Sequence, residues 1–399
     1  MIGPVTGLGR NLDGVRRGNL SAVLGLVHRA GAASRSEITQ LTGLNRSTVA
    51  ALVAELVALE LVVENSPEST NRVGRPSPVV TPHPGPVAIA VNPELDAITV
   101  GIIGLDARVL RRVRREVDHP ITAEETAALV AQILAESSAD LIGHRVVGIG
   151  LAVPGLVRSD DDTVRWAPHL GWMDSAIVSL VGAATGHPVR AGNDASLGGR
   201  AEHLFGVGKG IDDLIYLNGG ASGIGGGVIS GGVALGGHRG YAGEFGQNRP
   251  GFADPSDRRT PNGTLEDEVN RARLLAALGL AGGDETVLER AVLASSSPAV
   301  HEELARQRRV LAVALSNAIN VLNPELVVLG GFLASVYASD PGGLERDVAA
   351  QAVPASWEGT RIRPAGLGED RLMIGAAELA FASLLADPAG DGPTGPARY

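Results

Sequence analysis

Residues 87–388 alternate between short apolar, β-branched runs and segments with helical periodicity, and this alternation restricts the fold more than any other feature. Four strand-like runs stand near its start, VAIAVN, AITVGIIGL, RVLRRVRREV and VVGIGLAV, with the helical segment TAEETAALVAQILAES between the last two. A second block begins with the strand-like LIYLN and ends with VLAVALSNAINVLNPELVVLGG, which reads as a helix, a turn and a strand. Such a pattern predicts two α/β lobes with a ligand at the strand ends between them.

A small helical module precedes this body. After a first helical segment, RRGNLSAVLGLVHRAG, Ser34 and Glu37 form a capping pattern for a short helix that ends at Gly43, and Asn45 can cap a longer helix. A short helix, a glycine turn and a longer helix predict a helix-turn-helix, and the β-like runs LVVENS and VGRPSPVVTP predict a wing after it. The alternative is a helical hairpin that contacts only protein, and the order, lengths and caps favour the winged helix-turn-helix.

The charge of this head suits contact with nucleic acid. Residues 1–82 hold eight arginines against six acidic residues, whereas the rest of the chain carries 26 basic and 38 acidic residues. Double-stranded DNA is therefore the expected partner of the head. The expected DNA contacts are Arg46, Ser47 and Thr48 in the major groove, and Arg35, Arg72 and Arg75 at phosphates or the minor groove.

Composition excludes several classes of function. The chain has no cysteine, which removes disulfides, thiolate metal sites and cysteine nucleophiles. Its nine histidines include no pair at helical ligand spacing, so no metal site is expected. No uninterrupted apolar run approaches a bilayer span and the N-terminus lacks a signal-peptide core, which predicts a cytoplasmic protein without membrane contact.

Several motifs stand in an order that resembles a known family. GLAVPGLV, WAPHLGW, GNDASLGGRAEHLFGVGKG, NGGASGIGGGVISGG, GYAGEFGQ and NPELVVLGG follow one another as in the ROK family (repressors, open reading frames, kinases), and the resemblance covers about residues 16–388. A wing that ends in GRPSP directly before the body is similar to the family's repressor branch, the xylose and N-acetylglucosamine repressor type.

The resemblance implies an α/β protein in which a winged helix-turn-helix precedes a bilobal body of the sugar-kinase, actin-like (ribonuclease H-like) fold. Its last helix is expected to pack back on the first lobe. The expected divisions are 1–82 for the DNA-binding domain, 83–86 for a linker, 87–192 plus 370–388 for lobe 1, 193–369 for lobe 2 and 389–399 for a disordered tail.

The resemblance also implies a site for a sugar or sugar derivative. Asn193 and Asp194 match the family's Asn-Asp pair, and Glu244 and Glu266 match two further sugar-binding glutamates. The structural alternatives are N-capping for Asp194 and solvation for Glu266. The family's zinc loop is absent, because DRRTPNGTLED stands where its cysteines are expected. Two family positions are changed: Gln247 replaces a zinc-binding histidine, and His169, expected either to contact sugar or to cap a strand, replaces an asparagine.

Phosphoryl transfer is not expected. A kinase of this family needs a glycine-containing phosphate loop near residues 91–96, where this chain reads VNPELD. The second glycine loop, GGASGIGGG, is partly kept, and close packing is the favoured reason for its glycines.

These features together predict a DNA-binding regulator of carbohydrate genes, expected to repress, that acts as a homodimer or a dimer of dimers and uses neither cofactor nor metal. Two alternatives stay open: a sugar kinase with a DNA-binding head, and a regulator without a sugar ligand that a protein partner controls.

Overall fold

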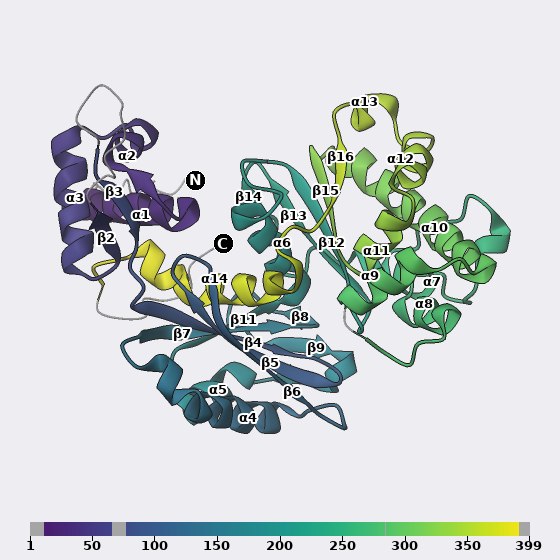
Figure 1. The fold of residues 1–399 in the computed structure, drawn as a ribbon, viewed down its shortest axis with the longest axis horizontal. Helices are drawn as coiled ribbons and strands as arrows, with labels where there is room; N and C mark the ends of the chain where they lie inside the picture. The colour runs from purple at the N-terminus through teal and green to yellow at the C-terminus, as the bar shows by residue number, and fades with distance from the viewer. Residues whose placement is uncertain (1–11, 66–76, 284, 391–399) are drawn as a thin grey trace, which may run out of the picture.

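The computed structural model describes residues 12–65, 77–283 and 285–390. Three parts are visible in Figure 1: a mostly helical head in purple and two sheet-containing lobes that follow it along the chain. The head ends at β3, and β4 opens the first lobe after the short segment that was predicted to be a linker. The part of the predicted tail beyond residue 390 lies outside the described residues.

The head has the predicted order of a winged helix-turn-helix. Ser34 accepts a hydrogen bond from the Glu37 backbone N–H, and Glu37 accepts one from the Ser34 N–H, so the capping box is confirmed. Gly43 ends the second helix with a φ of 68°, and the Asn45 side chain caps the third by accepting from the Thr48 N–H. The elements are α1 (Leu12–Ala30), β1 (Ala33–Ser34), α2 (Arg35–Thr42), α3 (Arg46–Ala58), β2 (Val62–Asn65) and β3 (Val79–Pro82).

Lobe 1 is built on a five-stranded sheet of order β11-β7-β4-β5-β6. The first three of these strands are parallel, and β5 and β6 continue antiparallel. Strands β4 and β5 are buried along their whole length, which explains their uninterrupted apolar sequences. Figure 1 shows α4 and α5 below the sheet and α14 above it, and the predicted return of the last helix to lobe 1 is confirmed.

The elements of lobe 1 are β4 (Pro86–Pro93), β5 (Ala97–Gly104), β6 (Val109–Glu116), α4 (Ala123–Glu136), β7 (Arg145–Val153), α5 (Ile177–Thr185), β11 (Val189–Asn193) and α14 (Arg371–Ala386). A small antiparallel sheet lies between β7 and α5 in the chain and consists of β8 (Leu156–Val157), β9 (Val164–Ala167) and β10 (Trp172–Ser175).

Lobe 2 repeats the topology of lobe 1. Its sheet has the order β14-β13-β12-β15-β16, in which β16, β15 and β12 are parallel and the other two strands are antiparallel. The β4–β5 and β12–β13 hairpins are therefore equivalent, and each turns at the carboxyl end of its first strand. Helix α6 (Asp194–Phe205) connects the two sheets and packs on α14 as well as on β12 and β13.

The strands of lobe 2 are β12 (Leu214–Gly219), β13 (Ile224–Ser230), β14 (Val233–Ala234), β15 (Leu326–Gly331) and β16 (Arg361–Pro364). Its remaining helices are α7 (Leu265–Glu268), α8 (Arg271–Leu278), α9 (Glu285–Ala294), α10 (Pro298–Leu322), α11 (Phe332–Ser339), α12 (Pro341–Ala349) and α13 (Pro354–Trp357).

The glycines of the second loop serve close packing. A Cβ on Gly225 would lie 2.6 Å from the Ala195 Cβ of α6, and one on Gly226 would lie 2.5 Å from the Phe245 ring. A Cβ on Gly223 would also collide with the Glu266 carboxylate. The favoured packing explanation for this glycine-rich sequence is therefore correct, and the glycines let a helix, an aromatic ring and a carboxylate approach the β12–β13 hairpin.

The head is joined to the body through buried polar contacts. His28 on α1 bonds the Leu105 carbonyl oxygen through Nδ1 at 2.5 Å and a carboxylate oxygen of Glu378 on α14 through Nε2 at 2.8 Å. Arg200 on α6 lies 3.9 Å from the other Glu378 oxygen, and the Phe205 ring meets the His28 ring edge-on at 5.3 Å. We call these four side chains, His28, Arg200, Phe205 and Glu378, the head joint.

Apolar packing continues across the head joint. Leu20 and Val27 of α1 belong to the same buried cluster as Met373 and Phe381 of α14, so the head shares its core with lobe 1. None of the helices in the described part of the chain has the length and apolar composition that a bilayer-spanning helix requires.

Candidate functional site

A cleft between the two lobes gathers all six residues predicted to bind a sugar. Its empty volume is about 610 Å³, including its open mouth. It lies at the carboxyl ends of β11 and β12, where a two-lobed α/β fold is expected to bind its ligand. The six residues are His169, Asn193, Asp194, Glu244, Gln247 and Glu266.

Asn193 and Asp194 occupy the junction of β11 and α6. Asn193, rather than Asp194, is the N-cap of α6: its Oδ1 accepts from the Ser196 N–H at 2.9 Å, while its Nδ2 donates to the Gly155 carbonyl at 3.0 Å. Asp194 is the first residue of the helix, and its Oδ1 accepts from the Ala195 N–H at 2.8 Å. Asn193 therefore fixes the turn that presents Asp194 to the cleft.

The Asp194 carboxyl group is electrostatically unusual. Burial raises its pKa to about 7, and the neighbouring charges of Glu244 and Glu94 act in the same direction. The pKa of Glu244 is also raised, first by burial and then by the charge of Glu266. A group of carboxyl oxygens held close together in a cleft is suited to accept hydrogen bonds from vicinal hydroxyls, which relieve the crowding of charge.

Glu266 is held in the cleft from two sides. Its Oε2 accepts from the Ile224 backbone N–H of β13 at 3.2 Å, and its Oε1 accepts from Gln247 Nε2 at 2.6 Å. Gln247, which stands where the family has a zinc-binding histidine, thus orients a carboxylate. Glu266 is directed into the cleft and is not a freely solvated surface residue, although the zinc loop that supports it in the family is replaced here.

Among the other residues that line the cleft are Trp166 and Asn218, which were not identified from the sequence. Trp166 on β9 is 45% exposed and offers an apolar face beside His169, which is also exposed. Asn218 lies near the carboxyl end of β12, and its Oδ1 accepts from the Tyr216 hydroxyl and from Arg371. The position of Asn218 after the apolar run LIYL could have identified it, because ligands bind at such strand ends.

The β4–β5 turn, where a kinase of this family would bind phosphate, is acidic. The β4–β5 turn carries Glu94, whose pKa burial raises, and the adjacent Asp96 adds to its negative surroundings. Asn92 points away from this turn and donates to the Ala152 carbonyl at 2.8 Å. The buried Arg371 is engaged by Glu285 at 2.9 Å and by Asn218 at 3.0 Å. Among the described residues around this turn, there is neither a glycine-lined backbone cradle nor an uncommitted arginine.

Across the residues that the structure describes, no group of three or more histidine, aspartate and glutamate side chains is arranged to hold a metal ion.

Four of the six predicted DNA-binding residues lie on two described helices of the head, α2 and α3. Arg46 and Ser47 are exposed on the first turn of α3, and Thr48 is partly exposed beside them. Arg35 forms a two-pronged ion pair with Glu64 of β2, at 2.5 and 2.6 Å, and so ties α2 to the wing. Arg72 and Arg75 lie outside the described residues.

Comparison with known proteins agrees with this architecture. The sequence profile of the ROK family matches residues 89–383. The xylose repressor of Bacillus subtilis (strain 168) is 23% identical over 369 residues, covering 92% of this chain and 95% of the repressor. The glucokinase of Streptomyces coelicolor is 28% identical over 317 residues, covering 71% of this chain and 94% of the kinase.

Among solved structures, a ROK family transcriptional regulator described as a homologue of the E. coli MLC protein superposes with a TM-score of 0.73. The two share 21% sequence identity over 93% of this chain and 97% of the regulator, which shows that they share the fold. The family profile spans most of the body, including the glycine-rich hairpin and the carboxylates of the cleft. The chain therefore belongs to the ROK family.

Proposed function

We propose that this protein is a DNA-binding transcriptional regulator, expected to repress genes of carbohydrate metabolism, whose body binds a sugar or sugar derivative in the cleft. The observation that carries the proposal is the combination of a winged helix-turn-helix head with a cleft that keeps the family's sugar-binding carboxylates. In addition, the β4–β5 turn, where a kinase would bind phosphate, is acidic. The repressor relative aligns with nearly the whole chain, whereas the glucokinase aligns with less of it, as expected if the head distinguishes the two groups.

Helix α6 offers a direct connection between the cleft and the head. Its first residue, Asp194, lines the cleft, and its later residues Arg200 and Phe205 belong to the head joint. Beyond the helix, Lys209 Nζ donates to the Arg29 carbonyl of α1 at 3.2 Å. A helix of twelve residues spans roughly 18 Å. Movement of the lobes around a bound sugar would shift α6 and bias the position of the head, which changes DNA affinity by a population shift.

The charges of the cleft argue against nucleotide binding. ATP would bring several negative charges beside Glu94 and Asp96, where Pro93 stiffens the turn and glycine is absent. Although Asp194 has a pKa close to that of an effective general base, a base without a phosphate cradle cannot transfer a phosphoryl group. We therefore propose that the protein is not an enzyme and needs no cofactor.

A combined DNA and sugar assay tests the proposed function. Genomic fragments retained by the full-length protein are first mapped by footprinting. D-xylose, D-glucose and N-acetyl-D-glucosamine are then screened by thermal shift and for release of that DNA. We expect one of these sugars, or a derivative, to stabilise the protein and change its DNA affinity. Glu244→Ala should abolish the sugar effect and leave DNA binding in place, because Glu244 lies in the cleft and far along the chain from the head.

Three results would contradict the proposal. Sugar-dependent ATP turnover that disappears in Asp194→Asn would identify a kinase. DNA binding without any sugar response would favour control by a protein partner. Failure of Arg46→Ala to weaken DNA binding would remove α3 as the recognition helix. Sedimentation of the DNA-bound protein tests the proposed homodimer or dimer of dimers, since paired half-sites require two heads.

Sugar affinity is expected to depend on pH. The ionised Asp194 carboxylate accepts hydrogen bonds from hydroxyls more strongly than the protonated form does. Because the pKa of Asp194 is about 7, affinity should rise between pH 6 and pH 8 and level off above that range. If only the ionised form binds, affinity at pH 6 should be about tenfold below the plateau. Calorimetric titration at several pH values measures this, and an affinity that stays flat or falls with pH would contradict it.

A further inference from the structure

Helix α7 carries two glutamates that are two residues apart and have different surroundings. Glu266 lines the cleft, whereas Glu268 is fully buried on the other side. The helix has only four residues, so it cannot be positioned by its own hydrogen bonds. The contacts of Glu268 therefore influence the placement of Glu266.

Glu268 accepts several hydrogen bonds from the loop that precedes α7. Its two carboxylate oxygens accept from the Arg259 backbone N–H at 3.0 and 2.9 Å, and one of them accepts from both the N–H and the hydroxyl of Thr260 at 2.8 Å. Although burial opposes ionisation, these hydrogen bonds lower the pKa of Glu268. The carboxylate thus holds the irregular loop that stands where the family has its zinc loop.

Arg306 on α10 closes the arrangement. Its side chain is 2% exposed, and it donates to the Asp257 carbonyl at 2.8 Å, to the Glu268 carboxylate at 3.2 Å and to the Glu268 carbonyl at 2.6 Å. It also donates two hydrogen bonds to the Glu303 carboxylate. One guanidinium on α10 therefore bonds the loop, the Glu268 carboxylate and the Glu268 backbone carbonyl at the same time. The compact ammonium group of a lysine cannot reach all of these acceptors.

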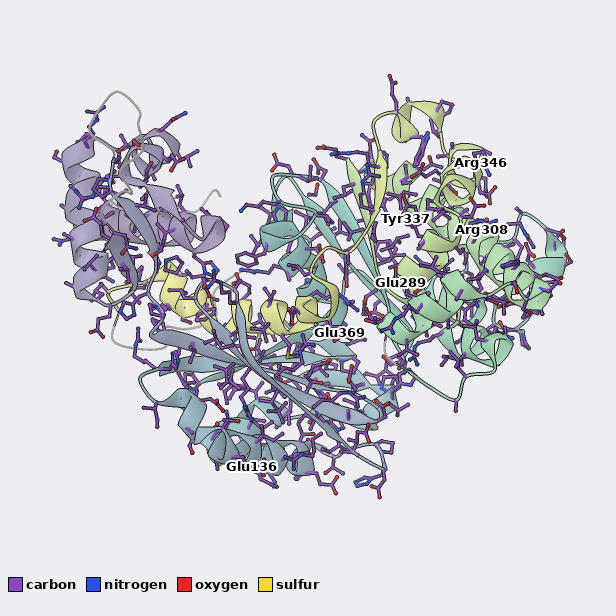
Figure 2. All side chains as sticks on the ribbon, viewed as in Figure 1. Glu136, Glu289, Arg308, Tyr337, Arg346 and Glu369 are labelled. Atoms are coloured by element: carbon purple, nitrogen blue, oxygen red, sulfur yellow. The ribbon has the colours of Figure 1, made fainter. Side chains whose placement is uncertain are left out.

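Helix α10 is a firm support for this arginine. It has 25 residues and packs on α11 and α12. Figure 2 shows Arg308, Tyr337 and Arg346 in the region where these three helices meet. Arg308 pairs with Asp340 at 3.3 Å, and the Tyr337 hydroxyl donates to Glu345 at 3.1 Å.

We propose that Arg306 is a positioning residue for the cleft: through Glu268 it fixes α7 and thereby aims the Glu266 carboxylate at the sugar, without touching the sugar itself. This inference rests on the proposed sugar-binding function. Arg306, Glu268 and the Asp257–Thr260 loop form a hydrogen-bonded brace on the side of α7 opposite the cleft.

A double-mutant cycle on sugar affinity tests the proposal. Affinity for D-xylose, D-glucose and N-acetyl-D-glucosamine is measured by calorimetry for the full-length wild type, Arg306→Lys, Glu266→Gln and the double variant. We expect Arg306→Lys to weaken binding by about tenfold in the wild-type background, and by less than about twofold when Glu266→Gln is present, since the lysine would act only through Glu266. Arg308→Lys, two residues along α10 from Arg306 and paired with Asp340 away from the loop, is the matched control and should change affinity less than about twofold.

The outcomes separate this inference from the proposed function. Absence of binding by the wild type to every sugar tested would overturn the proposed function and this inference with it. If the wild type binds a sugar, three results would overturn the positioning role alone. Arg306→Lys could weaken sugar affinity equally with and without Glu266→Gln, or could leave affinity unchanged. Glu266→Gln could itself have no effect on affinity. If Arg306→Lys does not melt cooperatively, Thr260→Val replaces it in the same cycle, because it removes one Glu268 hydrogen bond without changing charge.

Discussion

Replacing Glu378 by alanine is expected to destabilise the folded protein by about 3–5 kcal/mol, because it leaves the buried imidazolium of His28 without its counter-charge. Both side chains are almost completely buried, at 1% and 3% exposure. Both ring nitrogens of His28 face acceptors, and only the protonated ring has two N–H donors. Burial opposes this charge, but Glu378 overcomes it and raises the pKa of His28.

The same pair predicts a pH dependence of the head joint. A histidine whose pKa is raised on folding contributes stability that is fully present below its unfolded pKa of about 6.5 and is lost as pH rises through the folded value. The difference in free energy of unfolding between the wild type and Glu378→Ala should therefore be smaller at alkaline pH. Chemical denaturation of both proteins at pH 6 and pH 9 measures this difference.

The functional consequence of Glu378→Ala distinguishes coupling from simple stabilisation. We expect the variant to bind sugar within about twofold of the wild type but to lose most of the sugar-dependent change in DNA affinity, because the head joint links α6 to the head. Glu369→Ala is the matched control: this glutamate lies just before α14 and pairs with Arg112 at an exposed site, where an ion pair contributes less than about 1 kcal/mol. An unchanged sugar response in Glu378→Ala would refute the coupling.

Asp194→Asn is expected to stabilise the unliganded protein while removing most of its sugar affinity. A carboxyl group whose pKa rises from about 4 to about 7 on folding destabilises the fold progressively as pH increases through that interval. The neutral amide escapes this penalty, so at about 1.4 kcal/mol per pKa unit we expect a gain of up to about 4 kcal/mol at pH 8 and of only about 1–2 kcal/mol at pH 5. Thermal melts at the two pH values, with and without the sugar, measure both effects.

Asp161→Asn is the control for the expected stabilisation, because it also replaces an aspartate by the neutral amide. The Arg158 side chain hydrogen-bonds Asp161 and lowers the pKa of its carboxyl group to about 2, opposite to the shift at Asp194. Its removal should therefore fail to stabilise the protein at pH 8. A gain in stability for Asp161→Asn equal to that of Asp194→Asn would show that a general reduction of negative charge, and not the site, is responsible.

Much of the fold could be predicted from the sequence because it depends on local patterns. The capping box of Ser34 and Glu37 and the end of α2 at Gly43 are set by residues close in the chain, and they appear as expected. The uninterrupted apolar runs of β4 and β5 correspond to strands buried on both faces. Family motifs then indicated which polar residues would share a cleft, since Asn193, Asp194, Glu244 and Glu266 meet across 73 residues of sequence.

The partners of individual side chains could not be predicted in the same way. The sequence shows Arg35 as one more arginine of a basic head, and only the structure pairs it with Glu64 of the wing. It shows a glutamine in place of a zinc ligand, and only the structure shows that glutamine orienting Glu266. These contacts depend on distances between elements, which periodicity does not encode.

The amino-acid sequence by itself determined the winged head, the two α/β lobes, the loss of cysteine ligands and the absence of a glycine phosphate loop, because each follows from residue type and spacing along the chain. The tertiary structure decided that Asp194 titrates near neutrality, that Arg306 braces the loop behind Glu266 and that His28 meets Glu378 across 350 positions. Burial and long-range pairing produce these properties, and both exist only once the lobes and the head have packed together.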